Sequence, residues 1–151
     1  MNTLEIRSRA RKFCGKQFLG VFARNTLPKS LPRNLDRPIV LICNTHELSK
    51  PGEHWVSMYI NPIDCTGEFF CSLGLPPLDT FVRFMNHFCY NGWIRNSKQL
   101  QSAVSKFCGH YCIFYCAHKM LNLDMQTIIN CFSDDVSLND YIAHSFACSY
   151  Y

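Results

Sequence analysis

The sequence predicts an α+β domain in which a mainly antiparallel sheet packs on one buried central helix. The segment 108–121, CGHYCIFYCAHKML, is apolar around most of a helical circumference, which is typical of a helix inside a domain. Short runs of strand character precede it, and two of them are joined by a turn, which favours antiparallel pairing. A chain of 151 residues that is 48% hydrophobic supports one core, so we expect a single domain over 1–151.

One helix and one long loop are expected before the first predicted strand. Residues 3–14 have a helical pattern that Thr3 can cap. Residues 25–37 combine two prolines with turn-forming side chains, so they predict an extended surface loop. The core face of the helix is expected to carry Leu4, Ala10, Phe13 and Cys14.

Three strands follow. Residues 38–44, PIVLICN, form an apolar run of strand length that suits a buried strand. Residues 54–60, HWVSMYI, alternate between two faces, and 67–73 follow after a hairpin turn as their antiparallel partner. The alternation places on one face His54, Val56, Met58 and Ile60.

The second half of the chain predicts more helix than strand. Residues 78–90 have amphipathic helical spacing, and 93–100 suggest a further strand after a turn. Two shorter helices are expected after the central one, at 123–132 and 138–147. The core face of the helix at 78–90 is expected to carry Leu78, Phe81, Val82, Met85 and Phe88.

Charge and cysteine content restrict the environment of the protein. Residues 1–37 carry nine of the 15 Lys and Arg against two acids, a pattern that suits a solvated basic helix or, alternatively, contact with DNA. Ten cysteines in a chain of this size indicate free thiols in a reducing compartment rather than a disulfide scaffold. No apolar stretch approaches the length of about 18 residues that spans a bilayer, and no signal-peptide centre is present. We therefore expect a soluble, intracellular protein that is not secreted and has no membrane contact.

Cys108 is the best candidate for a nucleophile. At the start of a helix its sulfur meets free backbone N–H groups and the positive end of the helix dipole, which favour thiolate. Gly109 removes side-chain bulk where an acyl carbonyl must approach. His54 lies at the start of a strand, where an imidazole can face a cleft, and Gln101 offers an amide donor for an oxyanion. Trp55 either shields the pair from solvent or packs in the core.

A metal site is the alternative interpretation of the same helix. Cys108, Cys112 and Cys116 share a helical face, with His110 and His118 nearby. No short Cys-x-x-Cys pair is present, and such an apolar helix more often buries its cysteines as packing. We therefore expect no bound metal.

The motifs resemble the adenovirus protease (adenain) family of cysteine endopeptidases, in the version encoded by adenovirus-like DNA elements such as Polinton transposons. The matching segments are FLGVF (18–22), IVLICNTHELSKPGEHWV, GEFFCSLGLPP and QSAVSKFCGHYC. Papain-like enzymes place the cysteine before the histidine, so the order here argues against them. The resemblance implies that His54 is the general base, Cys108 the nucleophile and Gln101 the oxyanion donor, acting through a thiolate–imidazolium pair.

The sequence departs from that family at one position. Where the family has an acid that orients the histidine, this chain has Cys71, a poor hydrogen-bond acceptor. Neither Glu68 nor Asp64 is an obvious substitute, because each is an odd number of residues from Cys71 and so faces the other side of a regular strand. The expected consequence is weakened activity.

The expected function is therefore that of a cysteine endopeptidase that cleaves capsid or core precursor polypeptides of a virus or virus-like element during particle maturation. The alternatives are a protease for ubiquitin-like modifiers and a catalytically decayed module that only binds a partner. No cofactor is required, although the resemblance implies activation by a peptide or by DNA, which the basic residues 1–37 would contact. We expect a monomer in the host nucleus or cytoplasm, or packaged in particles.

Overall fold

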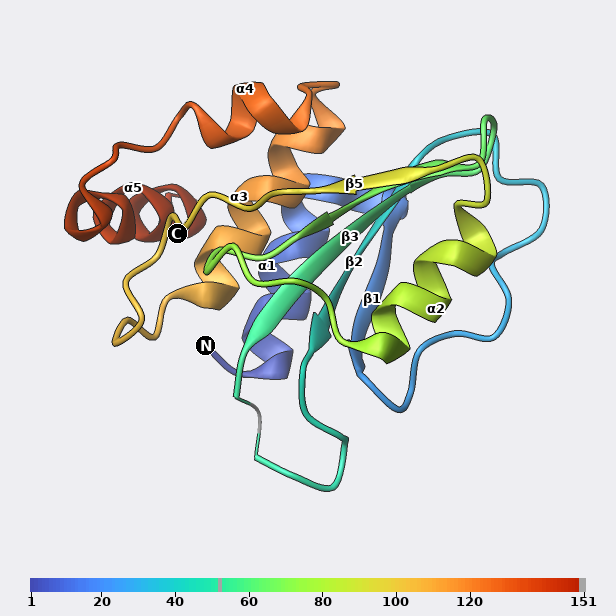
Figure 1. The fold of residues 1–151 in the computed structure, drawn as a ribbon, viewed down its shortest axis with the longest axis horizontal. Coiled ribbons are helices and arrows are strands. Elements are labelled where there is room, and N and C mark those ends of the chain that lie inside the picture. Colours follow the sequence, from blue (N-terminus) through green and yellow to red (C-terminus); the bar gives the residue numbers. More distant parts are fainter. Residues whose placement is uncertain (52, 150–151) are drawn as a thin grey trace.

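The computed structural model describes residues 1–51 and 53–149, in which the strands form one sheet in the order β1-β2-β3-β4-β5. The strands are β1 (Phe18–Ala23), β2 (Ile39–Asn44), β3 (Trp55–Asn61), β4 (Thr66–Phe70) and β5 (Trp93–Arg95). The helices are α1 (Thr3–Cys14), α2 (Asp79–Phe88), α3 (Cys108–Met120), α4 (Met125–Ile129) and α5 (Val136–Cys148), with a short 3-10 turn η1 (Gly15–Gln17). Helix α2 covers one face of the sheet, and α1 and α3 cover the other (Figure 1).

The α+β class is confirmed, and the sheet is mixed. The pairs β2–β3 and β3–β4 are antiparallel, as expected, whereas β1–β2 and β4–β5 are parallel. Strand β1 was not expected. It pairs with β2 across the long loop that follows it, so no nearby turn signals the pairing, and its register is interrupted between Phe18 and Gly20.

The two faces of the sheet bury two apolar clusters. The α3-side core includes Val40 and Ile42 of β2, and the α2-side core includes Ile39, Leu41 and Cys43. This alternation explains why all six residues of β2 are buried, since both faces of the strand are covered. The predicted alternation of β3 is also confirmed, because its even-numbered apolar residues lie in the α2-side core.

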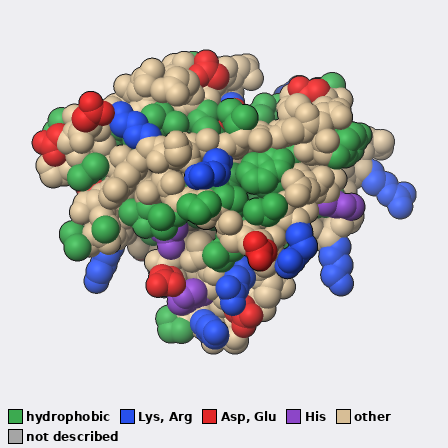
Figure 2. Space-filling model, viewed as in Figure 1, with side chains coloured by type: hydrophobic (Ala, Val, Ile, Leu, Met, Phe, Trp, Pro, Cys, Tyr) green, Lys and Arg blue, Asp and Glu red, His purple; other side chains and the backbone are tan. Residues whose placement is uncertain are grey.

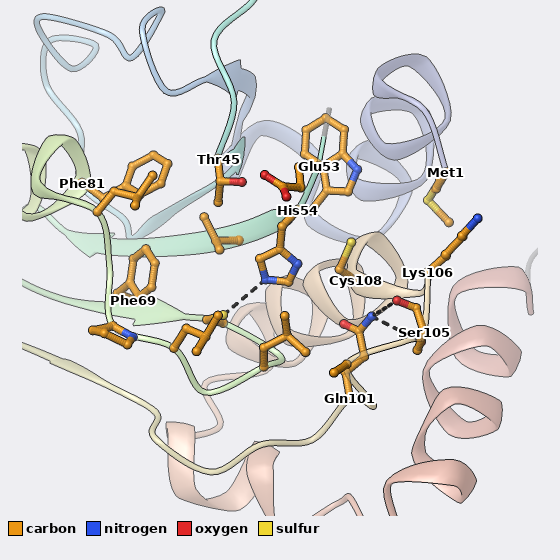
Figure 3. Close-up of a pocket in the computed structure, with 18 residues that line it drawn as sticks. Met1, Thr45, Glu53, His54, Phe69, Phe81, Gln101, Ser105, Lys106 and Cys108 are labelled. Atoms are coloured by element: carbon orange, nitrogen blue, oxygen red, sulfur yellow. Dashed lines mark hydrogen bonds between the residues drawn. The ribbon is translucent and has the colours of Figure 1, made fainter. Parts of the chain in front are cut away.

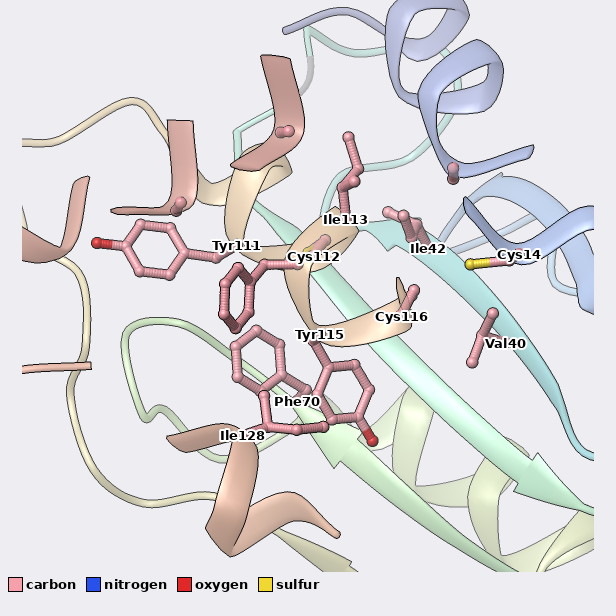
Figure 4. Close-up of a cluster of buried hydrophobic side chains, with 14 of the residues drawn as sticks. Cys14, Val40, Ile42, Phe70, Tyr111, Cys112, Ile113, Tyr115, Cys116 and Ile128 are labelled. Carbon is pink, nitrogen blue, oxygen red and sulfur yellow. The ribbon is translucent and has the colours of Figure 1, made fainter. Parts of the chain in front are cut away.

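Helix α3 is buried along most of its length, as the sequence predicts. Eleven of its residues are buried, and its aromatic side chains fill the α3-side core (Figure 4). The ring of Tyr115 stacks on Phe70 of β4 with centroids 4.6 Å apart and planes within 4°. Cys112 and Cys116 are fully buried among these side chains. Helix α3 is therefore held in place by a closely packed core along most of its length.

The structure corrects several details of the helices. Helix α1 is capped by Asn2 rather than Thr3, because the Asn2 side chain accepts from Glu5 N–H while the Glu5 carboxylate accepts from Asn2 N–H. Leu4 is 72% exposed, and the buried face consists of Ile6, Ala10 and Cys14. In α2 the N-cap residue Leu78 is also exposed. The predicted helix 123–132 is reduced to the five residues of α4.

Strand β5 ends after Arg95, well before the expected residue 100. The physical reason is the next side chain, Asn96, which is buried. Its amide donates to the Cys71 carbonyl at 2.7 Å and accepts from the Cys71 N–H at 2.9 Å. A side chain thus replaces the main-chain ladder at this point, and it fixes the residue that follows β4.

Basic residues of the N-terminal segment take part in the fold. Arg9 of α1 donates to the carbonyl of Ala147 in α5 at 2.8 Å, and Arg24 forms an ion pair with Glu47 at 3.3 Å. On the face shown in Figure 2, Lys and Arg side chains are interspersed with Asp and Glu. Among the described residues, no helix has both the length and the apolar character needed to cross a bilayer.

Glu68 faces away from the predicted site, as the alternation of the strand requires. Its carboxylate accepts from the Tyr115 hydroxyl and forms an ion pair with Lys119 at 3.0 Å, with side-chain exposures of 12% for Glu68 and 7% for Lys119. The ammonium group also lies 4.3 Å from the centroid of the Tyr59 ring. Glu68 therefore neutralises a buried cation on the α3 side of the sheet.

Replacing Glu68 with alanine is expected to lower the free energy of unfolding by about 3–5 kcal/mol, because the Lys119 ammonium is left buried without its partner. Urea unfolding measures this change. Glu47→Ala is the matched control, since it removes an exposed ion pair and should cost about 0–1 kcal/mol. Equal effects of the two substitutions would contradict this account of the buried pair.

Candidate functional site

A cleft of about 710 Å³ lies where the start of β3, the segment after β4 and the start of α3 meet. It brings together four of the residues singled out from the sequence: His54, Cys71, Gln101 and Cys108. Trp55 also lines it. Much of the remaining wall is apolar. Figure 3 shows His54, Gln101 and Cys108 converging on this space from different segments of the chain.

His54 is held at the end of the β2–β3 pairing. Its carbonyl accepts from the Thr45 N–H at 2.9 Å, which continues the ladder beyond Asn44 and Trp55. One ring nitrogen, Nε2, lies 3.3 Å from the Cys71 sulfur, and Figure 3 shows the imidazole also turned toward Cys108. The ring therefore lies beside the Cys71 sulfur and faces the side of the cleft where Cys108 lies.

Cys108 is the first residue of α3, as expected. Burial raises the pKa of its thiol, although the backbone N–H groups of Trp55 and Gly109 and the Met1 amino group act to lower it. Burial also lowers the pKa of His54, against the effect of the nearby Glu53 carboxylate. Both shifts favour the neutral forms. At Cys108 the effects that lower the pKa at the helix start are smaller than the effect of burial, which raises it.

Cys71 occupies the place of a third group beside His54. Burial raises the pKa of its thiol, while the backbone N–H groups of Leu75, Leu73 and Gly74 donate toward the sulfur and lower it. Three N–H groups around one side chain form a setting that favours an anion. The Cys71 thiol is thus a weak hydrogen-bond acceptor, although the N–H groups around it would also suit a carboxylate.

Gln101 is 1% exposed, and hydrogen bonds fix its amide. The Ser72 hydroxyl donates to Oε1 at 2.6 Å, and Nε2 donates to the Ser105 carbonyl at 2.9 Å. These bonds determine which end of the amide faces Ser105 at the start of the turn before Cys108. Nε2 also donates to the Ser105 hydroxyl at 3.2 Å, so both amide hydrogens are engaged by Ser105, and an oxyanion would have to replace the hydroxyl as the acceptor of one of them.

The two expected substrate-contacting residues differ in their roles. Trp55 lines the cleft and also packs against the α3-side core, so both of its expected uses are compatible with the structure. At Gly109 a side chain would lie 3.1 Å from Ile6 of α1, so the glycine makes room for helix packing. Its expected contact with substrate stays a prediction. The Gly109 N–H acts on the Cys108 sulfur and lowers the pKa of that thiol.

Three functional neighbours were not identified from the sequence. Asn96 clamps the main chain of Cys71, Ser72 orients Gln101, and Glu53 supplies negative charge beside His54. The position of Ser72 directly after Cys71 and that of Glu53 directly before His54 were usable signals. Asn96 had none, because its two bonds cross 25 residues of chain.

The alternative metal set on α3 does not assemble. Cys112 and Cys116 are completely buried in the core, and burial raises the pKa of both thiols well above the ordinary value. Within residues 1–51 and 53–149, the metal-ligating atoms that cluster do not include these two sulfurs or that of Cys108. All ten cysteines are free thiols.

Comparison with solved structures identifies proteins of similar fold. No protein-family model and no curated protein matches the chain. It is similar to the crystal structure of ASFV pS273R protease, with a TM-score of 0.68 and 15% identity over 95% of this chain and 66% of that one. The Se-Met crystal structure of the same protease gives a TM-score of 0.56 and 19% identity over 72% of this chain and 43% of that one. The chain spans 66% or less of these structures, and shares with them an α+β fold whose mixed five-stranded sheet packs on helices.

Proposed function

We propose that this protein is a cysteine endopeptidase in which Cys108 is the nucleophile, His54 the general base and Gln101 an oxyanion donor. The observation that carries the proposal is the convergence of these three side chains on one cleft, where the imidazole also lies within hydrogen-bond distance of the Cys71 sulfur. The fold similarity to ASFV pS273R protease supports the reaction class.

Catalysis starts from a neutral thiol and a neutral imidazole. His54 takes the proton of Cys108 as the sulfur attacks the carbonyl carbon of the scissile bond, and an imidazolium and a tetrahedral oxyanion form together. The Gln101 amide stabilises the oxyanion. When the C–N bond breaks, His54 returns the proton to the leaving amine. His54 then activates a water that hydrolyses the thioester and restores the thiol.

The weak step is the formation of imidazolium. In this cleft the group on Nε2 is the Cys71 thiol, which provides no negative charge. Glu53 raises the pKa of His54, but its effect is smaller than that of burial, and its carboxylate also pairs with His46. The proposed enzyme is therefore slower than one with a carboxylate at position 71.

The proposed substrates are precursor polypeptides of a virus or virus-like element, because the similar fold belongs to a protein described as an ASFV protease. The largely apolar wall of the cleft, which includes Leu73, Leu75 and Phe81, suits an extended peptide with apolar side chains.

The function is tested with a library of extended peptides, by mass spectrometry of new amino termini. Wild-type protein should generate new termini at a restricted set of sequences, and Cys108→Ala should generate none. New termini that persist in Cys108→Ala would assign the cleavage to another residue or protein. Their absence in both would favour the module that only binds a partner.

Replacing Cys71 with aspartate is expected to raise the rate of peptide cleavage by roughly tenfold, less than the about 10²–10⁴-fold that a complete general acid–base contribution supplies. The carboxylate would accept from the N–H groups of Leu73, Gly74 and Leu75 and stabilise the His54 imidazolium. Cys71→Asn is the matched control, since it has a similar shape without the charge. An unchanged or lower rate in Cys71→Asp would show that position 71 does not orient the base.

A further inference from the structure

A second group of titratable side chains lies outside the cleft, between α3 and α5. His110 comes from α3, and His144 and Cys148 come from α5. Each offers one ligand atom, and these atoms all lie within 4.8 Å of one another. The proposed peptidase mechanism uses none of the three.

We propose that His110, His144 and Cys148 form a zinc-binding site that fastens α5 to α3. Two imidazoles and one thiolate are a donor set that Zn²⁺ accepts in tetrahedral geometry, with a water molecule at the fourth position. The ligands come from two helices distant in sequence, which is why the spacing within α3 alone does not reveal the site.

The distance between the two ligands on α5 suits this geometry, whereas the ligand atom of His110 lies within 4.8 Å of the other two and would move closer to them on zinc binding. The sulfur of Cys148 lies 3.6 Å from His144 Nε2. In a tetrahedral site, Zn–S and Zn–N bonds of about 2.3 and 2.0–2.1 Å place the two ligand atoms about 3.6 Å apart. His144 and Cys148 are four residues apart on α5, so they share one helical face, and the His110 ring centroid lies 5.1 Å from that of His144.

The buried member of the group has an unsatisfied polar atom. His110 is 8% exposed, and its Nδ1 is buried with no hydrogen-bond partner among the described residues. An imidazole in such a position costs free energy unless it finds a partner. A zinc ion bound by His110 fixes the tautomer of the ring and offsets part of that cost.

Phe107 covers one side of the site, and the positive charges of Arg9 and the Met1 amino group lie near enough to act on His110. The ring of Phe107 packs edge-on against both histidines, with centroids 5.0 Å from His110 and 5.5 Å from His144. His144 is exposed and Cys148 is half-buried, so an ion can enter from the α5 side. Binding releases the Cys148 proton to solvent, and the thiolate supplies the negative charge.

Zinc binding at this site would help to fix the start of α3, which lines the cleft. Phe107 is the residue before Cys108, and it lies between the catalytic end of α3 and the proposed metal ligands. A zinc ion between α3 and α5 would restrain this end of α3 without contacting the reacting atoms. The proposed zinc site is thus separate from the peptidase chemistry, and its fourth position is open to water.

The test uses the full chain carrying Cys108→Ala, which removes competing metal binding by the cleft. The metal-free protein is titrated with Co²⁺ as a spectroscopic probe and then with Zn²⁺. The expected result is a single equivalent with a thiolate-to-cobalt charge-transfer band and a zinc-dependent rise in melting temperature. His144→Ala and Cys148→Ser should each weaken Zn²⁺ binding by at least about tenfold.

Controls separate this site from other ligands. His87→Ala removes an exposed histidine on α2, and Cys131→Ser removes an exposed thiol, and neither should change the affinity. His110 is buried, so the more accessible pair on α5 carries the test. Failure to bind Zn²⁺, or binding that His144→Ala and Cys148→Ser leave unchanged, overturns the proposal. Neither result affects the peptidase proposal, which rests on other residues.

Discussion

Replacing His54 with alanine is expected to lower kcat/KM for peptide cleavage by about 10²–10⁴-fold, the usual contribution of general acid–base catalysis. The effect should fall near the upper end of this range, because burial raises the pKa of Cys108 and the thiol then needs a base to take its proton. The measurement is the initial rate on a peptide identified from the library. His87→Ala, at an exposed position of α2, is the matched control and should keep the wild-type rate.

The pH dependence follows from the same protonation states. His54 must be neutral to accept the proton, and burial lowers its pKa below 6.5. Activity should therefore persist as the pH falls to 6.5 and be lost only below it, as the imidazole becomes protonated. An acidic limb centred above pH 6.5, or one that remains in His54→Ala, would contradict the role of His54.

Replacing Gln101 with alanine is expected to lower kcat by about 10²–10³-fold with little change in KM, because an oxyanion donor acts in the transition state. Ser72→Ala is the matched control. It removes the bond that orients the Gln101 amide but leaves the donor in place, so a smaller loss is expected. Melting temperatures of both variants are needed, since the side chain of Gln101 is buried. A fall in stability with an unchanged kcat would make Gln101 a structural residue.

Local patterns predicted the parts of the fold that depend on local chemistry. The apolar circumference of 108–121 predicted α3, and the hydrophobic run of 38–44 predicted β2. Strand β1 could not be predicted in the same way, because its parallel pairing with β2 depends on a long connection. The exposed Leu4 shows a similar limit, since an apolar residue near a helix end is buried only if a neighbour covers it.

The candidate site could also be predicted only in part. Chain order, residue type and the resemblance to the adenovirus protease family together singled out His54, Gln101 and Cys108, which the fold brings to one cleft. The direction of the pKa shift at Cys108 was not predictable. Burial, which depends on the whole fold, raises this pKa by more than the groups at the start of the helix lower it. The backbone N–H groups around Cys71 were equally hidden, since they arise from the turn that follows β4.

The most direct measurement is site-resolved labelling by a peptidyl electrophile at about pH 6.5, where ordinary thiols are almost fully protonated. Mass spectrometry compares the labelling of Cys108 with that of Cys131, an exposed thiol in the same molecule. If His54 activates Cys108, Cys108 is labelled at least about tenfold faster, and His54→Ala removes this advantage while Cys131 is unchanged. Labelling of Cys108 that is no faster than that of Cys131, or that is unaffected by His54→Ala, would contradict the account.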